Sequence, residues 1–122
     1  MLNNILHIVP AAYFNAQPPG LPYLPETYAA DGFIHCTREP EIMLQIANRF
    51  YKDAAGEVLV LVIDAGRVTA LVKWEAPAHP DGTPAGPGET RLFPHIYGPL
   101  NRDAIIGTRA ARRDQNGNFI SV

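Results

Sequence analysis

Six consecutive apolar residues form the stretch Val58-Leu59-Val60-Leu61-Val62-Ile63, and this stretch decides the fold that the sequence predicts. Asp64-Ala65-Gly66 follows at once and ends it with turn-forming residues. Because no polar residue alternates with the apolar ones, we expect a strand that is buried on both faces. The stretch is therefore predicted to be the centre of the sheet.

Shorter segments on either side of this stretch complete the predicted sheet. Strands are expected over residues 5–9, 33–37, 68–75, 92–97 and 104–113. Pro40 opens a helix that runs to about residue 51, with an apolar stripe expected to pack in the core. The pair Asn116-Gly117 predicts a hairpin turn that residues 119–122 close. Residues 76–90, rich in proline and glycine, are expected to form an exposed loop.

The order of these elements predicts an α+β fold with a curved, mostly antiparallel sheet and one main helix. A length of 122 residues suits a single domain over residues 1–122, and 47% hydrophobic against 18% charged residues indicates a globular protein. The net charge of −2 provides no electrostatic footprint for a nucleic-acid duplex. We therefore expect one domain that does not bind duplex nucleic acid.

Cysteine content and the N-terminus indicate a compartment. Cys36 is the only cysteine, so no intramolecular disulfide and no cysteine-rich metal site can form. The N-terminus lacks a basic region followed by an apolar run, and no stretch approaches the ~18 apolar residues that span a bilayer. We expect a cytoplasmic protein with no membrane partner.

Two segments place a histidine among apolar and chain-stiffening residues. On the strand expected at 33–37, His35 and Thr37 share a face, so an imidazole and a hydroxyl can reach one ligand. His95 follows Pro94, and Tyr97 lies two positions on, where its ring could stack on an aromatic ligand. A hydrogen-bonded structural role is the alternative for each histidine at this stage.

Three further features bear on the chemistry. His7 is central in the first expected strand and is a third candidate, while His79 in the loop is a poor fourth. Three imidazoles can bind Zn²⁺, but metal-ligand spacing is absent, so no metal is expected. Glu75 beside Trp74 could act as a base or stabilise positive charge, or it could be a solvated strand end.

These segments together resemble a known family. The resemblance is carried by Asp31-Gly32-Phe33-Ile34-His35-Cys36-Thr37, by Gln45 with Asn48 and Tyr51, by Val72-Lys73-Trp74-Glu75 and by Phe93-Pro94-His95-Ile96-Tyr97-Gly98-Pro99-Leu100. In combination they resemble the bacterial family called domain of unknown function 952, over roughly residues 6–105. That family has no assigned activity to carry over.

The family is similar in turn to the ADP-ribosyltransferase fold, particularly the NAD-binding lobe of RNA 2′-phosphotransferases. Leu6-His7-Ile8 would take the position of the histidine on the first strand of that lobe, and Ile34-His35-Cys36-Thr37 that of its Val-His-Leu-Ser-like segment. The resemblance implies that His7, His35 and Thr37 surround a nicotinamide-ribose pocket. The chain departs from the pattern at Ile8-Val9, where the lobe has Gly-Thr or Gly-Ser.

We therefore expect an enzyme, or a former enzyme, that is ADP-ribosyltransferase-like and binds NAD or a related nucleotide. His35, His95 and Glu75 are the predicted catalytic residues, and His7, Thr37 and Tyr97 the predicted ligand-binding residues. The alternative is a non-catalytic module for a small ligand or a protein, with an aromatic surface formed by loop residues Tyr13, Tyr23 and Tyr28. Convergence of the histidines on one cleft would favour the enzyme.

Overall fold

The computed structural model describes residues 3–77 and 91–122 of the chain. Most of the loop expected at 76–90 lies outside the described residues, and so does His79. Within the described ranges, no helix combines the length and the apolar character that a membrane crossing requires.

The first sheet has three antiparallel strands, with the predicted central strand in the middle. Its order is β1 (Asn4–Pro10), β3 (Val58–Asp64) and β6 (Ile105–Ala110). Leu61 and Ile63 of β3 pack into one apolar cluster, whereas Val60 and Val62 pack into another on the opposite face. The prediction of a strand buried on both faces is therefore confirmed.

The remaining strands do not extend this sheet, so the prediction of one curved sheet is wrong in that respect. A second antiparallel sheet has the order β2 (Ile34–His35), β5 (Phe93–Tyr97), β4 (Leu71–Glu75). A separate hairpin joins β7 (Arg112–Arg113) and β8 (Phe119–Ser121). The α+β class, the antiparallel pairing and the single small domain agree with the sequence.

The segment predicted as one strand at 33–37 explains the division. Its first part, β2, pairs with β5, but Thr37 exchanges two main-chain hydrogen bonds with Leu6 of β1, at 2.6 and 2.8 Å. One short segment thus changes partners and ties the two sheets together. Sequence alternation predicts a strand but not which neighbour each residue pairs with.

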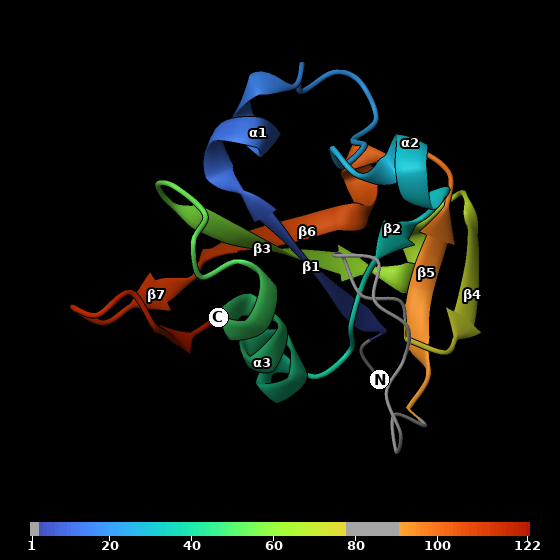
Figure 1. The fold of residues 1–122 in the computed structure, drawn as a ribbon. Coiled ribbons are helices and arrows are strands. Elements are labelled where there is room, and N and C mark those ends of the chain that lie inside the picture. Colours follow the sequence, from blue (N-terminus) through green and yellow to red (C-terminus); the bar gives the residue numbers. More distant parts are fainter. Residues whose placement is uncertain (1–2, 78–90) are drawn as a thin grey trace.

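One main helix accompanies the sheets, as predicted (Figure 1). This helix, α3 (Pro40–Phe50), begins with proline in its first turn. The shorter helices are α1 (Ala11–Ala16), α2 (Tyr28–Asp31), η1 (Ala65–Arg67) and η2 (Arg102–Ala104). One apolar cluster joins the two sheets, and the other joins the first sheet to α3 and β8.

His7 lies at the junction between the sheets and is only 4% exposed. Its Nδ1–H donates to the main-chain carbonyl of His35 at 2.6 Å, because a carbonyl oxygen can only accept. Nε2 of the neutral ring therefore accepts from the hydroxyl of Tyr23, at 2.9 Å. Burial lowers the pKa of His7 from 6.5 to about 4. A neutral imidazole thus connects β1 to β2 and to the loop that carries Tyr23.

Asn48 on α3 holds the C-terminal hairpin. Its side-chain amide donates to the carbonyl of Phe119 at 2.9 Å, and its side-chain oxygen accepts from the N–H of Phe119 at 2.7 Å. The pair reproduces the two hydrogen bonds of a neighbouring strand. Arg113 adds a hydrogen bond of 2.8 Å to the carbonyl of Ala54, just beyond the helix. The hairpin therefore fixes the C-terminal end of α3.

We expect the stability of the protein to fall as the pH decreases from about 6.5 to 4. In this window the unfolded chain protonates His7 while the folded chain keeps it neutral, so protons favour unfolding. The pKa difference corresponds to about 3 kcal/mol of unfolding free energy. Urea unfolding at several pH values measures it, with His7→Gln as the comparison. An equal pH dependence in both proteins would contradict the buried neutral imidazole.

Asn48→Ala is expected to destabilise the fold by about 1–3 kcal/mol, because it leaves the N–H and the carbonyl of Phe119 without their partners. The control is Asn15→Ala, an exposed asparagine on α1. Thermal unfolding of the two variants beside the parent protein makes the comparison. Similar melting temperatures for both variants would show that the hydrogen bonds of the Asn48 side chain contribute little to stability.

Candidate functional site

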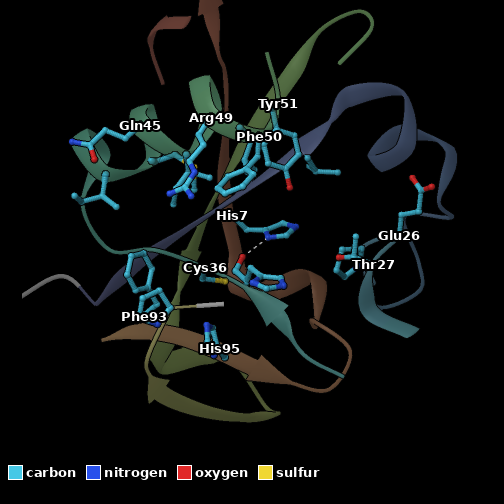
Figure 2. A pocket seen from close by; sticks show the side chains of 18 of the residues that line it. His7, Glu26, Thr27, Cys36, Gln45, Arg49, Phe50, Tyr51, Phe93 and His95 are labelled. Atoms are coloured by element: carbon cyan, nitrogen blue, oxygen red, sulfur yellow. Dashed lines mark hydrogen bonds between the residues drawn. The ribbon is translucent and has the colours of Figure 1, made fainter. Parts of the chain in front are cut away.

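A cavity of about 510 Å³ opens along the free edge of β1, between α3 and the second sheet (Figure 2). His7, His35 and His95 all contribute to its lining. Its size lies within the usual range of small-molecule sites. The structure thus brings the three predicted histidines to one cleft. Such a convergence is the feature that we expected, from the sequence, to favour an enzyme.

His95 is held by a carboxylate on the neighbouring strand. Its Nδ1 lies 2.9 Å from Oε1 of Glu75, and the carboxylate can only accept, so Nδ1 carries the proton. The hydroxyl of Tyr97 donates to the same oxygen at 2.5 Å. Phe33 stacks on the imidazole with ring centroids 4.2 Å apart. These contacts fix the orientation of the ring and leave Nε2 as its unprotonated nitrogen when the ring is neutral.

The local environment favours that neutral ring. Burial lowers the pKa of His95, and the hydrogen bond that His95 donates to Glu75 opposes this shift without cancelling it. Hydrogen bonds from Tyr97 and His95 lower the pKa of Glu75, so its carboxylate stays ionised. The pKa of Tyr97 is raised because its proton binds that carboxylate. A neutral imidazole backed by a carboxylate is suited to accept a proton at Nε2.

His35 has a carboxylate partner of its own, which the sequence analysis did not identify. Nε2 of His35 lies 2.8 Å from Oδ2 of Asp31. Asp31 ends the short helix α2, and Gly32 follows with φ of 78°, a left-handed turn that glycine adopts without strain. The turn returns the chain so that Asp31 reaches the strand residue four positions later. The Asp31-Gly32 turn signal was visible in the sequence, but its hydrogen bond to His35 was not.

His35 and His95 form a pair across the second sheet. They are direct partners in the register of β2 with β5, and their ring centroids are 5.7 Å apart. Phe33 contacts both rings, at 4.7 Å from His35 and 4.2 Å from His95. Two imidazoles, each hydrogen-bonded to its own carboxylate, therefore share one wall of the cavity. This arrangement can both accept and donate protons at neighbouring points of a bound ligand.

His7 lines the same cavity but differs from this pair. Both of its ring nitrogens have hydrogen-bond partners inside the protein. Its pKa of about 4 keeps it neutral at physiological pH, and desolvation is the main cause. Its ring orients β1 against β2. The structure gives it a supporting place in the wall, with no ring nitrogen left over for a ligand.

The main chain of β1 supplies a polar group at the cavity that side-chain patterns do not reveal. Leu6 turns its N–H and carbonyl toward Thr37, away from β3. In an antiparallel strand these directions alternate, so Ile8 also turns both groups away from β3. Ile8 lines the cavity, whereas its side chain packs in the cluster beneath α3. A donor and an acceptor of the backbone therefore face the cavity at this residue.

Three other predicted residues lie outside the cavity lining. Thr37 is 1% exposed and bonds through its main chain to Leu6, and its hydroxyl has no hydrogen-bond partner within the described residues. Glu75 and Tyr97 stand behind His95, one as its acceptor and the other as a second donor to that acceptor. Glu75 and Tyr97 thus lie behind His95 and form one hydrogen-bonded group with it.

Helix α3 contributes more to the cavity than its pattern predicted. The apolar stripe was expected to pack in the core, and Met43 and Ala47 do so. Ile42, Ile46 and Phe50, from the same stripe, line the cavity as well. The apolar stripe of a helix has the same sequence pattern whether it packs against a core or lines a ligand cavity. The sequence therefore could not distinguish the two.

The alternative based on an aromatic loop surface finds little support. Tyr23 is completely buried, and Tyr13 and Tyr28 pack partly buried against the core cluster. Burial strongly raises the pKa of Tyr23 as well as that of Cys36, so neither side chain ionises near neutral pH.

Among residues 3–77 and 91–122, no three acidic, histidine or cysteine side chains gather as metal ligands do.

Comparison with solved structures shows the same fold elsewhere. The crystal structure of protein CC0527 from Caulobacter crescentus superposes with a TM-score of 0.74 at 24% sequence identity, covering 96% of this chain and 93% of that one. The solution NMR structure of CC0527 gives a TM-score of 0.69, also at 24% identity, with coverages of 95% and 90%. No curated protein matches the chain.

The sequence pattern of one family extends over most of the chain. It matches residues 8–108, which include every cavity histidine except His7, and its description is "Protein of unknown function (DUF952)". The chain therefore belongs to the DUF952 family.

Proposed function

We propose that this protein is an enzyme that binds NAD or a related nucleotide in the cavity and uses His95 as a general base. The observation that carries the proposal is the pair of carboxylate-bound imidazoles, His35 and His95, with ring centroids 5.7 Å apart on one cavity wall. Perturbed, oriented titratable groups that gather in a cleft are typical of active sites.

The choice of nucleotide rests on the main-chain groups of Ile8. A donor and an acceptor side by side on a strand edge complement a planar carboxamide, the polar group of nicotinamide. The isoleucine in place of the glycine found in ADP-ribosyltransferases packs its side chain in the cluster beneath α3. Phe50 and Phe93 add aromatic surface for a flat ring.

Each of these residues would have a separate role in the reaction. Ile8 would orient the nicotinamide, and the imidazole of His35 would contact the adjoining ribose. Nε2 of His95 would take a proton from the water molecule that attacks the ribose carbon, while the bond to nicotinamide breaks and its electron pair leaves with the ring. Glu75 would stabilise the imidazolium that forms at His95.

Titration with NAD and with ADP-ribose, followed by NMR, tests the binding. Both ligands are expected to shift the ring signals of His35 and His95, and only NAD should shift the amide signal of Ile8, since ADP-ribose lacks nicotinamide. The amide of exposed Ile106 on β6 serves as an internal reference. If millimolar ligand leaves the signals of His35 and His95 unchanged, the proposal is wrong.

Glu75→Gln tests the role of the carboxylate. Because the negatively charged acceptor Glu75 raises the pKa of His95, replacing its carboxylate with a neutral amide should lower that pKa further below the ordinary value. A weaker base should slow nicotinamide release from NAD by about 10²-fold or more. Ring titration by NMR and initial rates provide the two measurements, with exposed Glu57→Gln as control. An unchanged pKa of His95 would exclude this coupling.

A further inference from the structure

We propose that Nδ1 of His35 accepts a hydrogen bond from the 2′-hydroxyl of the sugar that carries the leaving nicotinamide, and that Asp31 positions the ring for this contact. The substrate class is then a riboside of ribo configuration, as opposed to a 2′-deoxy or an arabino sugar. This inference rests on the proposed function, because it assigns the recognition of the sugar in the same ligand.

The two carboxylates decide which nitrogen of each imidazole is left for a ligand. A carboxylate can only accept, so Nε2 of His35 carries the proton that it donates to Asp31 at 2.8 Å. Nδ1 of the neutral His35 ring is therefore an acceptor, as is Nε2 in the neutral ring of His95, whose Nδ1 donates to Glu75. Each histidine thus offers one lone pair on the side of the ring that its carboxylate does not occupy.

Both lone pairs are accessible. Among the side chains of residues 3–77 and 91–122, the hydroxyl of Thr37 is the only fully buried polar atom without a hydrogen-bond partner. Within these ranges Nδ1 of His35 and Nε2 of His95 have no partner either, so each of them reaches solvent. Both residues line the cavity, and a ligand bound there can donate to them.

The two acceptors are neighbours on one wall. His35 and His95 are direct partners in the register of β2 with β5, so their side chains leave the same face of the sheet. Their ring centroids are 5.7 Å apart. Figure 2 shows His95 across the cavity from Phe50 of α3. A sugar between these two sides would turn one face to the histidines and the other to α3.

The stereochemistry of the proposed reaction matches this pair of acceptors. Nicotinamide leaves from one face of the ribose ring, so the water held by Nε2 of His95 attacks C1′ from the opposite face. In NAD the 2′-hydroxyl lies on that opposite face, on the carbon next to C1′. A wall that holds the attacking water at His95 therefore brings the neighbouring acceptor of His35 to the 2′-hydroxyl. An arabino sugar turns this hydroxyl to the nicotinamide face, and a 2′-deoxy sugar lacks it.

Asp31 is a positioning residue in this arrangement. Its carboxylate holds Nε2 of His35 and so fixes the rotation of the ring. Without this hydrogen bond the ring could turn and exchange its two nitrogens. The contact with the sugar would then lose its fixed acceptor, while the separate pair of His95 with Glu75 would remain.

The closing experiment compares NAD with two analogues of its nicotinamide ribose, one 2′-deoxy and one arabino. NMR titration of the full chain gives the affinities before turnover is appreciable. NAD should bind at least about fivefold more tightly than either analogue, because each analogue leaves Nδ1 of His35 without its donor. The NMR signal of this ring nitrogen should shift with NAD and stay in place with the 2′-deoxy analogue.

Two replacements of His35 provide a matched pair. The amide of asparagine takes the position of Nδ1, whereas the amide of glutamine takes the position of Nε2, where it meets Asp31. His35→Gln should therefore reduce the preference for NAD to within about twofold, and His35→Asn should retain it. Asp31→Ala should also reduce the preference, since the ring loses its fixed orientation, whereas exposed Asp53→Ala should leave it unchanged.

The outcomes separate the two proposals. Equal affinities for NAD and the 2′-deoxy analogue, tight binding of the arabino analogue, or a preference that survives His35→Gln would overturn the hydroxyl contact. The proposed function still stands in these cases if NAD shifts the signals of Ile8 and His95. A ribo preference that depends on His35, with no shift at Ile8, keeps the contact and rejects the nicotinamide assignment. If none of the three ligands binds, both proposals are wrong.

Discussion

The imidazole of His7 donates to the main chain of β2 and accepts from Tyr23, so a single buried ring joins three segments that are far apart in the sequence. The free edge of β1 would otherwise extend along its whole length. Hydrogen bonds to His7 and the pairing of Leu6 with Thr37 close part of that edge, and the remainder opens at Ile8. The cavity lies beside this junction, between α3 and the second sheet.

The junction also determines which side chains face the cavity. The carbonyl oxygen of His35 accepts a hydrogen bond from His7, and the side chain of His35 lies on the cavity wall next to His95. The supporting carboxylates arrive from different directions, Asp31 from α2 and Glu75 from β4. Each imidazole is thus oriented by a part of the structure that is independent of the other.

Much of the fold could be predicted from local pattern. The central strand, the main helix after Pro40 and the hairpin at Asn116-Gly117 all depend on contacts within a few residues, and all three are confirmed. The division into two sheets was not predicted, because alternation at residues 33–37 does not say that Ile34 and Thr37 pair with different strands. Of the predicted site residues, the histidines converge on one cavity, whereas Thr37, Glu75 and Tyr97 lie outside its lining.

The sequence by itself determined which residues are apolar on which period, where the chain turns and which imidazoles are held in rigid segments, since these properties belong to short stretches of chain. Only the tertiary structure decided what each polar group contacts. Asp31 with His35 and Glu75 with His95 are combinations of residues from different elements. A histidine becomes a structural bridge or a base according to the partner of its second nitrogen, and that partner is supplied by the fold.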